Sequence, residues 1–181
     1  MLVKDVLGEC LTKMGKDNFL VGETFSDAEQ ALTDRLLAAL NIAYKEAVTE
    51  YIPLYAEEET DAEDGLIDIS GLGHRIIYPV SFTAGGMRCR LWSRPDGVAV
   101  NFRGKGVLRY AYLPEDFSVG DSIDDMRLTP SVLSDGTLAE YWFQDKVFDL
   151  AEAYAESFRM SLSRLRYKGR AMRLGAGRRS L

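Results

Sequence analysis

The side chains that most often carry out catalysis are few in this sequence and lie far apart. His74 is the only histidine, and the two cysteines are Cys10 and Cys89. A histidine-based catalytic pair or a multi-histidine metal site therefore has too few residues to form. Two distant cysteines are typical of a reducing compartment rather than of a disulfide scaffold. The sequence predicts no catalytic, cofactor-binding or metal-binding residues.

Carboxylates and glycines form clusters, but none has the spacing of a known ion or phosphate site. Acidic residues gather at 57–64 and at 116–125 without the regular Asp-x-Asp-x-Asp-Gly spacing of a calcium loop. The segments 71–73 and 104–106 hold paired glycines without the Gly-Lys-Ser/Thr ending of a phosphate loop. We interpret 57–64 as a solvated linker and both glycine pairs as turns between strands.

The alternation over residues 87–93 gives one predicted strand two unlike faces. Met87, Cys89 and Leu91 form the apolar face, and Arg88, Arg90 and Trp92 form the other. Tryptophan and arginine are favoured in protein interfaces, so Arg88, Arg90 and Trp92 are a candidate subunit interface. Packing of Trp92 against a neighbouring helix is the alternative.

Charge is unevenly distributed along the chain. The net charge is −6, from 22 basic and 28 acidic residues, but Arg159–Leu181 holds eight basic residues and no acidic one. Residues 1–158 therefore keep 14 basic and 28 acidic residues, a net charge of −14. Such a body repels nucleic acid. The basic segment could contact nucleic acid or the acidic surface of a neighbouring copy or another protein, or it could be a solvated tail that binds nothing. Of these, assembly is favoured, because an acidic body and a basic segment attract each other. The candidate partner contacts in the segment are Arg170, Met172, Arg173, Leu174, Arg178 and Arg179.

Helical periodicity lies at both ends of the chain. It predicts helices over 2–14, from a Ser26 cap to about Tyr51, over 130–144 and over 146–167. Ser26 and Glu29 have the spacing of a capping box, and Pro53 ends the second helix. Residues 168–181 contain glycines and no sustained period, so we expect an extended basic arm.

The sequence pattern in the middle of the chain predicts short strands joined by tight turns. Strands are predicted over 66–70, 75–83, 87–93, 98–102 and 107–113, with a turn at 94–97 where Gly97 supplies a positive φ. The predicted fold class is α+β: a bundle of the N-terminal helices (1–56) and the C-terminal helices (130–167), with an inserted antiparallel β-meander or small barrel (65–113). The long polar loop 114–129 is expected to bind or order something.

The order of these parts is itself informative. Together with the segments YIPLYAEEE (51–59), YAYLPE (110–115) and AEYW (139–142), it resembles the head–tail adaptor, or connector, proteins of tailed bacteriophages and prophages. The layout is also similar to that of the tubular tail protein A group of short-tailed phages. The resemblance covers roughly residues 2–166. It implies a structural protein, not an enzyme, that forms a ring, commonly a dodecamer, between the portal and the tail.

The resemblance also implies the partners and the location. The partners would be further copies of the chain in the ring, the portal protein, and a tail or nozzle protein. DNA would pass through the channel without sequence-specific binding, and no membrane or cofactor would be involved. The protein would be made in the host cytoplasm and end in the neck of the virion. The alternatives are a cytoplasmic enzyme with a dispersed site, or a small regulatory binding module that uses Trp92 and its neighbouring arginines.

Overall fold

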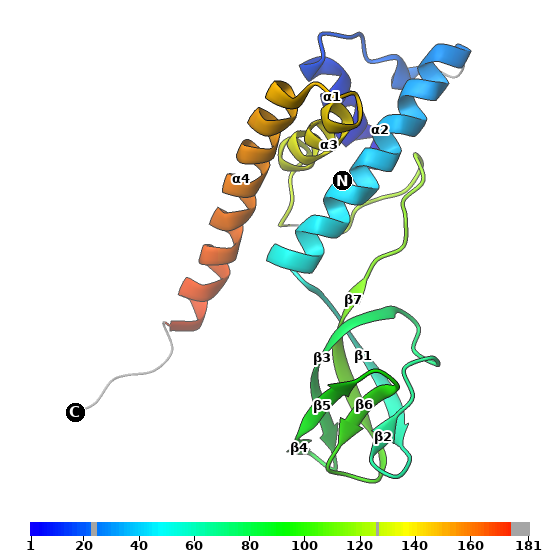
Figure 1. Cartoon of the computed structure of the whole chain (residues 1–181), viewed down its shortest axis with the longest axis vertical. Coiled ribbons are helices and arrows are strands. Elements are labelled where there is room, and N and C mark those ends of the chain that lie inside the picture. The colour runs from blue at the N-terminus through cyan, green and yellow to red at the C-terminus, as the bar shows by residue number, and fades with distance from the viewer. Residues whose placement is uncertain (23–24, 126, 175–181) are drawn as a thin grey trace, which may run out of the picture. The chain divides into compact units, whose positions relative to one another are not determined.

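The computed structural model describes residues 1–22, 25–125 and 127–174, with side chains up to residue 165 (Figure 1). The chain divides into two compact units. Met1–Ile52 and the chain from Asp116 onward form a helical unit, and Pro53–Glu115 form a β unit. The predicted α+β class, a helical bundle with a β insert, is confirmed.

The helices of the helical unit are α1 (Val3–Lys13), α2 (Asp27–Glu46), α3 (Pro130–Gln144) and α4 (Phe148–Leu174), with a 3₁₀ turn at Phe19–Val21 and a π-helical turn at Ala47–Tyr51. Two of these four helices, α2 and α3, begin where the sequence places their caps. The Glu29 N–H donates to the Ser26 hydroxyl at 3.3 Å, and the Ser26 N–H donates to the Glu29 carboxylate at 2.8 Å. This reciprocal bonding is the predicted capping box. At the start of α3 the Val132 N–H donates to the Thr129 hydroxyl at 3.4 Å, and Pro130 occupies the first helical position.

A glycine brings three helices of the bundle together. The buried side chains include Leu7 and Leu11 of α1, Leu36 and Leu40 of α2, Leu133 and Leu138 of α3, and Phe158 and Leu162 of α4. A Cβ built on Gly136 of α3 would lie 2.8 Å from the Phe158 ring and 3.0 Å from the Ala43 Cβ of α2. Only glycine leaves room for both neighbours at this position.

The polar loop after the β unit is ordered by its own chain. The Ile123 N–H donates to the Met1 carbonyl at 2.8 Å. The Asn41 side chain accepts from the Phe117 N–H at 2.8 Å and donates to the Phe117 carbonyl at 3.2 Å. The loop is therefore held against the N-terminus and α2 of its own unit, and the expectation that 114–129 binds or orders something stays a prediction.

The β unit consists of two antiparallel sheets. Its strands are β1 (Leu54–Ala62), β2 (Leu66–Ile67), β3 (Arg75–Ala84), β4 (Met87–Cys89), β5 (Leu91–Arg94), β6 (Gly97–Val100) and β7 (Gly104–Leu113). The sheet orders are β1-β7-β3-β4 and β2-β6-β5. The predicted antiparallel pairing is confirmed. The sheets nevertheless form neither a closed barrel nor a meander in sequence order.

The acidic run 57–64 is mostly a strand, so its interpretation as a solvated linker was wrong. β1 pairs with β7 along its whole length. Glu57, Glu59 and Asp61 point outward, while Glu58 is half-buried and accepts a hydrogen bond from the Tyr110 hydroxyl. Because Glu58 is a carboxylate on the inward side of β1, the run lacks the alternation of apolar and polar residues by which a strand is recognised.

The predicted strand 87–93 is two strands in two different sheets. The chain crosses between them at Arg90, whose N–H donates to the Asn101 side chain at 2.7 Å. The alternation of faces is therefore broken, and Met87, expected on the apolar face, is 70% exposed. The turn that follows is confirmed, because Gly97 has a φ of 154° and pairs with Arg94.

The last helix is longer than expected. α4 continues beyond residue 167 to Leu174, so 168–174 is helical rather than part of an extended arm. Residues 168–174 consist of residue types with high helix propensity (Lys, Arg, Ala, Met and Leu) apart from Gly169, whose helix propensity is low. Arg178 and Arg179 lie outside the described residues.

Candidate protein interface

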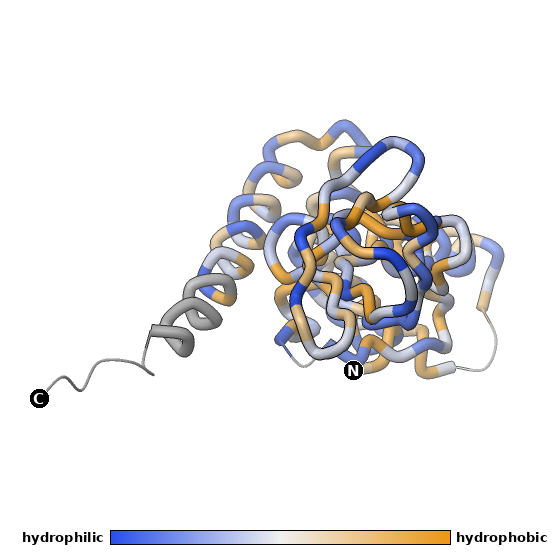
Figure 2. The backbone as a smooth tube through the Cα atoms, turned by 90° about the horizontal axis from the view of Figure 1, so that it is seen from below, coloured by the Kyte–Doolittle hydropathy of each residue, from blue (hydrophilic) through white to orange (hydrophobic). Residues whose placement is uncertain are grey.

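A wide groove lies on the helical unit. It has a volume of about 940 Å³ and is formed by α3, α4 and the last turn of α2. Its small and apolar lining includes Gly136, Ala139, Ala151, Ala155 and Phe158, and its carboxylates are Glu46, Glu140, Glu152 and Glu156. Figure 2 shows hydrophilic and hydrophobic residues interspersed along the described part of α4. The groove therefore offers apolar contact and negative charge to the same ligand.

An exposed apolar cluster closes one end of this groove. Phe143 and Phe148 are 61% and 58% exposed, with ring centroids 5.8 Å apart in an edge-on arrangement. Val147 and Leu150 are exposed beside them in sequence. We call these four residues the aromatic corner. Exposed apolar groups concentrated at one place are typical of a protein contact surface.

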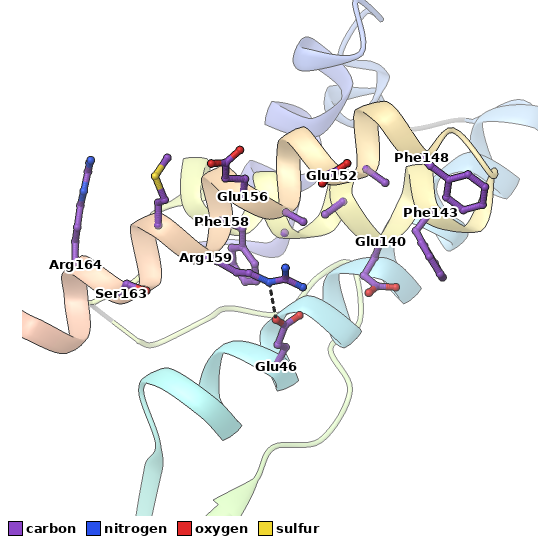
Figure 3. Close-up of a pocket in the computed structure, with 15 residues that line it drawn as sticks. Glu46, Glu140, Phe143, Phe148, Glu152, Glu156, Phe158, Arg159, Ser163 and Arg164 are labelled. Carbon is purple, nitrogen blue, oxygen red and sulfur yellow. Dashed lines mark ion pairs between the residues drawn. The ribbon is translucent and has the colours of Figure 1, made fainter.

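An incompletely neutralised carboxylate lies on the α2 side of the groove. Glu46 and Arg159 point toward one another at 4.0 Å (Figure 3). Burial raises the pKa of Glu46, Arg159 opposes this, and the negative charges of Glu50 and Glu140 raise it further. A second cation near Glu46 would therefore be stabilised.

The two ends of the groove differ in chemistry. Phe143 and Phe148 lie at one end and Arg164 lies at the other, with Glu46 and Arg159 between them (Figure 3). This layout suits an elongated, basic segment that also carries apolar side chains. Among the described residues, no group of three His, Cys, Asp or Glu side chains is placed to hold a metal ion. No described helix is long and apolar enough to span a membrane.

The reactive side chains of the chain are used in packing. Cys10 is buried in the helical core, and burial raises the pKa of its thiol to about 12, as expected for a core residue rather than a nucleophile. Burial and the Glu58 carboxylate raise the pKa of Tyr110 to about 12. His74 stacks on Tyr112 with ring centroids 4.2 Å apart. Each group thus has a structural neighbour in its own unit.

The structure places the sequence-predicted contacts in two separate regions, the β4–β5 segment and the end of α4. Arg88, Arg90 and Trp92 are exposed on and between β4 and β5, and Trp92 is 53% exposed. Arg88 donates to the Val80 carbonyl at 3.1 Å. Arg170, Met172, Arg173 and Leu174 belong to the last turns of α4, where the structure describes the backbone and not the side chains.

The groove itself was not predicted from the sequence. Its residues come from α2, α3 and α4, which are far apart along the chain. One local signal was available: Phe143 and Phe148 flank a polar helix junction, Gln144–Val147, where a buried aromatic is unexpected. Aromatics beside a polar turn are candidates for exposure.

Neither a protein-family model nor a curated protein matches the chain. No function is therefore transferred from a homologue. The groove, the aromatic corner and the charge distribution are the features that bear on function.

Proposed function

We propose that the protein is a structural adaptor that forms a ring between the portal and the tail of a bacteriophage particle. The observation that carries this proposal is the aromatic corner beside an open groove on α3 and α4. Apolar side chains exposed in a single chain become buried when copies or partners assemble. The layout resemblance supplies the kind of assembly.

The charge distribution supports a channel through which DNA moves. Residues 1–158 have a net charge of −14, and β1 presents Glu57, Glu59 and Asp61 outward in a row. Because DNA is a polyanion, acidic surfaces near a channel repel it and do not retain it. DNA is therefore a passing occupant in this proposal and not a bound ligand.

The remaining roles follow from the proposed assembly. Copies of the chain contact one another around the ring, commonly twelve in such adaptors. The basic C-terminal segment contacts the portal or a neighbouring copy, and a tail or nozzle protein binds the opposite side. The site of action is the neck of the virion.

The experiment combines the full chain with portal rings from the phage or prophage genome that encodes it. Electron microscopy and mass measurement should show a second ring attached to the portal. The matched variant Phe143→Ser/Phe148→Ser should attach poorly while keeping the helical circular-dichroism signal, because both rings are exposed. A chain that stays monomeric or dimeric beside the portal contradicts the proposal and favours an enzyme or a small binding module.

A further inference from the structure

We infer that the groove between α3 and α4 binds the C-terminal segment 166–181 of a second copy of the same chain. This inference rests on the proposed ring and names the contact that joins neighbouring copies. The groove and the segment are different surfaces, so each copy donates one and receives the other. Contacts of this head-to-tail kind close into a ring when the rotation between copies suits it.

Charge complementarity selects this occupant. The groove is lined by four glutamates and two arginines, so its lining is net negative. Residues 166–181 hold six basic residues and no acidic one: Arg166, Lys168, Arg170, Arg173, Arg178 and Arg179. Among the described residues, Arg159 is the one cation within ion-pair range of Glu46, at 4.0 Å, the outer limit of that range. An arriving arginine would neutralise it by a charge-assisted hydrogen bond.

The apolar residues of the segment also match the groove. Tyr167, Met172 and Leu174 are spaced among the basic residues. The groove offers the Phe143–Phe148 pair at one end and the Phe158 side chain and alanines along its length. Methionine adapts to irregular apolar surfaces and makes favourable contacts with aromatic rings. A groove of about 940 Å³ has room for several of these side chains but not for the whole segment.

The segment of the same copy does not reach the Phe143–Phe148 end of this groove. With α4 helical to Leu174, the rise from Glu156 to Leu174 is about 27 Å, and that from Phe148 to Leu174 is about 39 Å. The seven residues 175–181 span at most about 25 Å when fully extended. The chain therefore cannot turn back to Phe148 without melting part of α4. An occupant that contacts Phe143 and Phe148 as well as the carboxylates of the groove must therefore come from a second copy.

A fluorescent peptide of residues 166–181, added to the dilute full chain, tests the inference. Anisotropy should show binding that weakens with salt. The groove variant Glu46→Lys/Glu140→Lys should weaken binding by more than about tenfold. The matched variant Glu57→Lys/Glu59→Lys makes the same change in net charge at two exposed positions of β1, and should leave binding within about twofold.

A charge-reversed peptide separates loss of binding from loss of folding. With Arg170, Arg173, Arg178 and Arg179 all changed to Glu, the peptide should bind the Glu46→Lys/Glu140→Lys chain better than the parent chain. Absence of parent binding, equal weakening by both variant pairs, or failure of this reversal overturns the inference. If rings still form on the portal in those cases, the proposed function stands and only the groove contact is wrong. If the full chain never attaches to the portal, the proposed function fails whatever the peptide does.

Discussion

The two units of the molecule present their exposed apolar side chains in different ways. In the helical unit, Phe143 and Phe148 line one end of a groove, and Val147 and Leu150 are exposed next to them in sequence. In the β unit, exposed apolar residues such as Tyr55, Met87 and Trp92 are spread over β1, β4 and β5. Single exposed apolar residues are ordinary on a protein surface, whereas a cluster beside a groove is not. The helical unit is therefore the part of the chain with a contact surface left open.

The two units also differ in how tightly their glycines are enclosed. A Cβ on Gly97 of the β unit would lie 2.5 Å from the Ile67 carbonyl oxygen, which is held in β-sheet pairing. A Cβ on Gly136 of the helical unit would meet the Phe158 ring and the Ala43 Cβ. A backbone oxygen in a sheet moves less readily than a side chain. A side chain added at Gly97 should thus destabilise the β unit more than one added at Gly136 destabilises the helical unit.

The largest expected effect is that of Gly97→Val in the β unit. The residue combines a φ of 154° with the close Ile67 oxygen, and both disfavour a β-branched side chain. We expect a loss of about 3 kcal/mol or more in the free energy of unfolding, measured by urea denaturation. The control is Gly71→Ala, since a Cβ there has open space. A Gly97→Val chain that unfolds like the parent would show that the turn at 94–97 is wrongly described.

A smaller effect is expected for Gly136→Ala in the helical unit. The added methyl group pushes on the Phe158 ring, which costs about 1–3 kcal/mol, while alanine recovers about 1 kcal/mol of helix propensity. The net loss in unfolding free energy should therefore be at most about 2 kcal/mol. The second change Phe158→Leu in the same chain should recover part of it. A neutral Gly136→Ala substitution, with no coupling to Phe158, would contradict the packing of α3 on α4.

The positions of these substitutions also show which features of the fold can be predicted from the sequence. The Ser26–Glu29 cap, the start of α3 at Pro130 and the turn at Gly97 depend on neighbours within a few residues, and all three were predicted. The break at Arg90 was not, because the Asn101 side chain that receives its N–H comes from a later part of the chain. Signals of short range are visible in a sequence, whereas partners brought in by folding are not.

The candidate site was harder to predict than the fold for the same reason. Glu46 and Arg159 are neighbours only because α2 and α4 pack around Gly136. The basic character of 159–181 was visible from composition alone. The groove that complements it was not, because no single segment contains its lining.

A still smaller effect is expected for Glu46→Gln at the groove. Because burial raises the pKa of Glu46, the folded state holds its proton more tightly than the unfolded state, and stability falls as the pH rises through that pKa. The substitution should therefore add a few tenths of a kcal/mol at pH 7 and nothing at a pH below the ordinary glutamate range. Urea denaturation of both chains at the two pH values measures this. Equal stability differences at both pH values would contradict the electrostatic origin. The same variant should bind the 166–181 peptide more weakly than the parent.

The smallest expected effect on stability is that of deleting residues 168–181. Among the described side chains of α4, Leu162 is the last that is buried, so the deleted part adds little to the described core. The thermal melt should be nearly unchanged, while stable attachment to the portal should be lost.

The truncated chain should also show no measurable affinity for duplex DNA, because five of the eight basic residues in 159–181 are removed and an acidic body remains. Any DNA affinity of the full chain should fall steeply with salt, since lysine and arginine contacts release counterions. A truncated chain that attaches to the portal normally would show that the segment has no role in assembly, and salt-independent DNA binding by it would contradict the channel. A lowered melting temperature of the truncated chain would instead show that the end of α4 packs against its own unit. The helical unit would then not differ from the β unit in having a contact surface left uncovered.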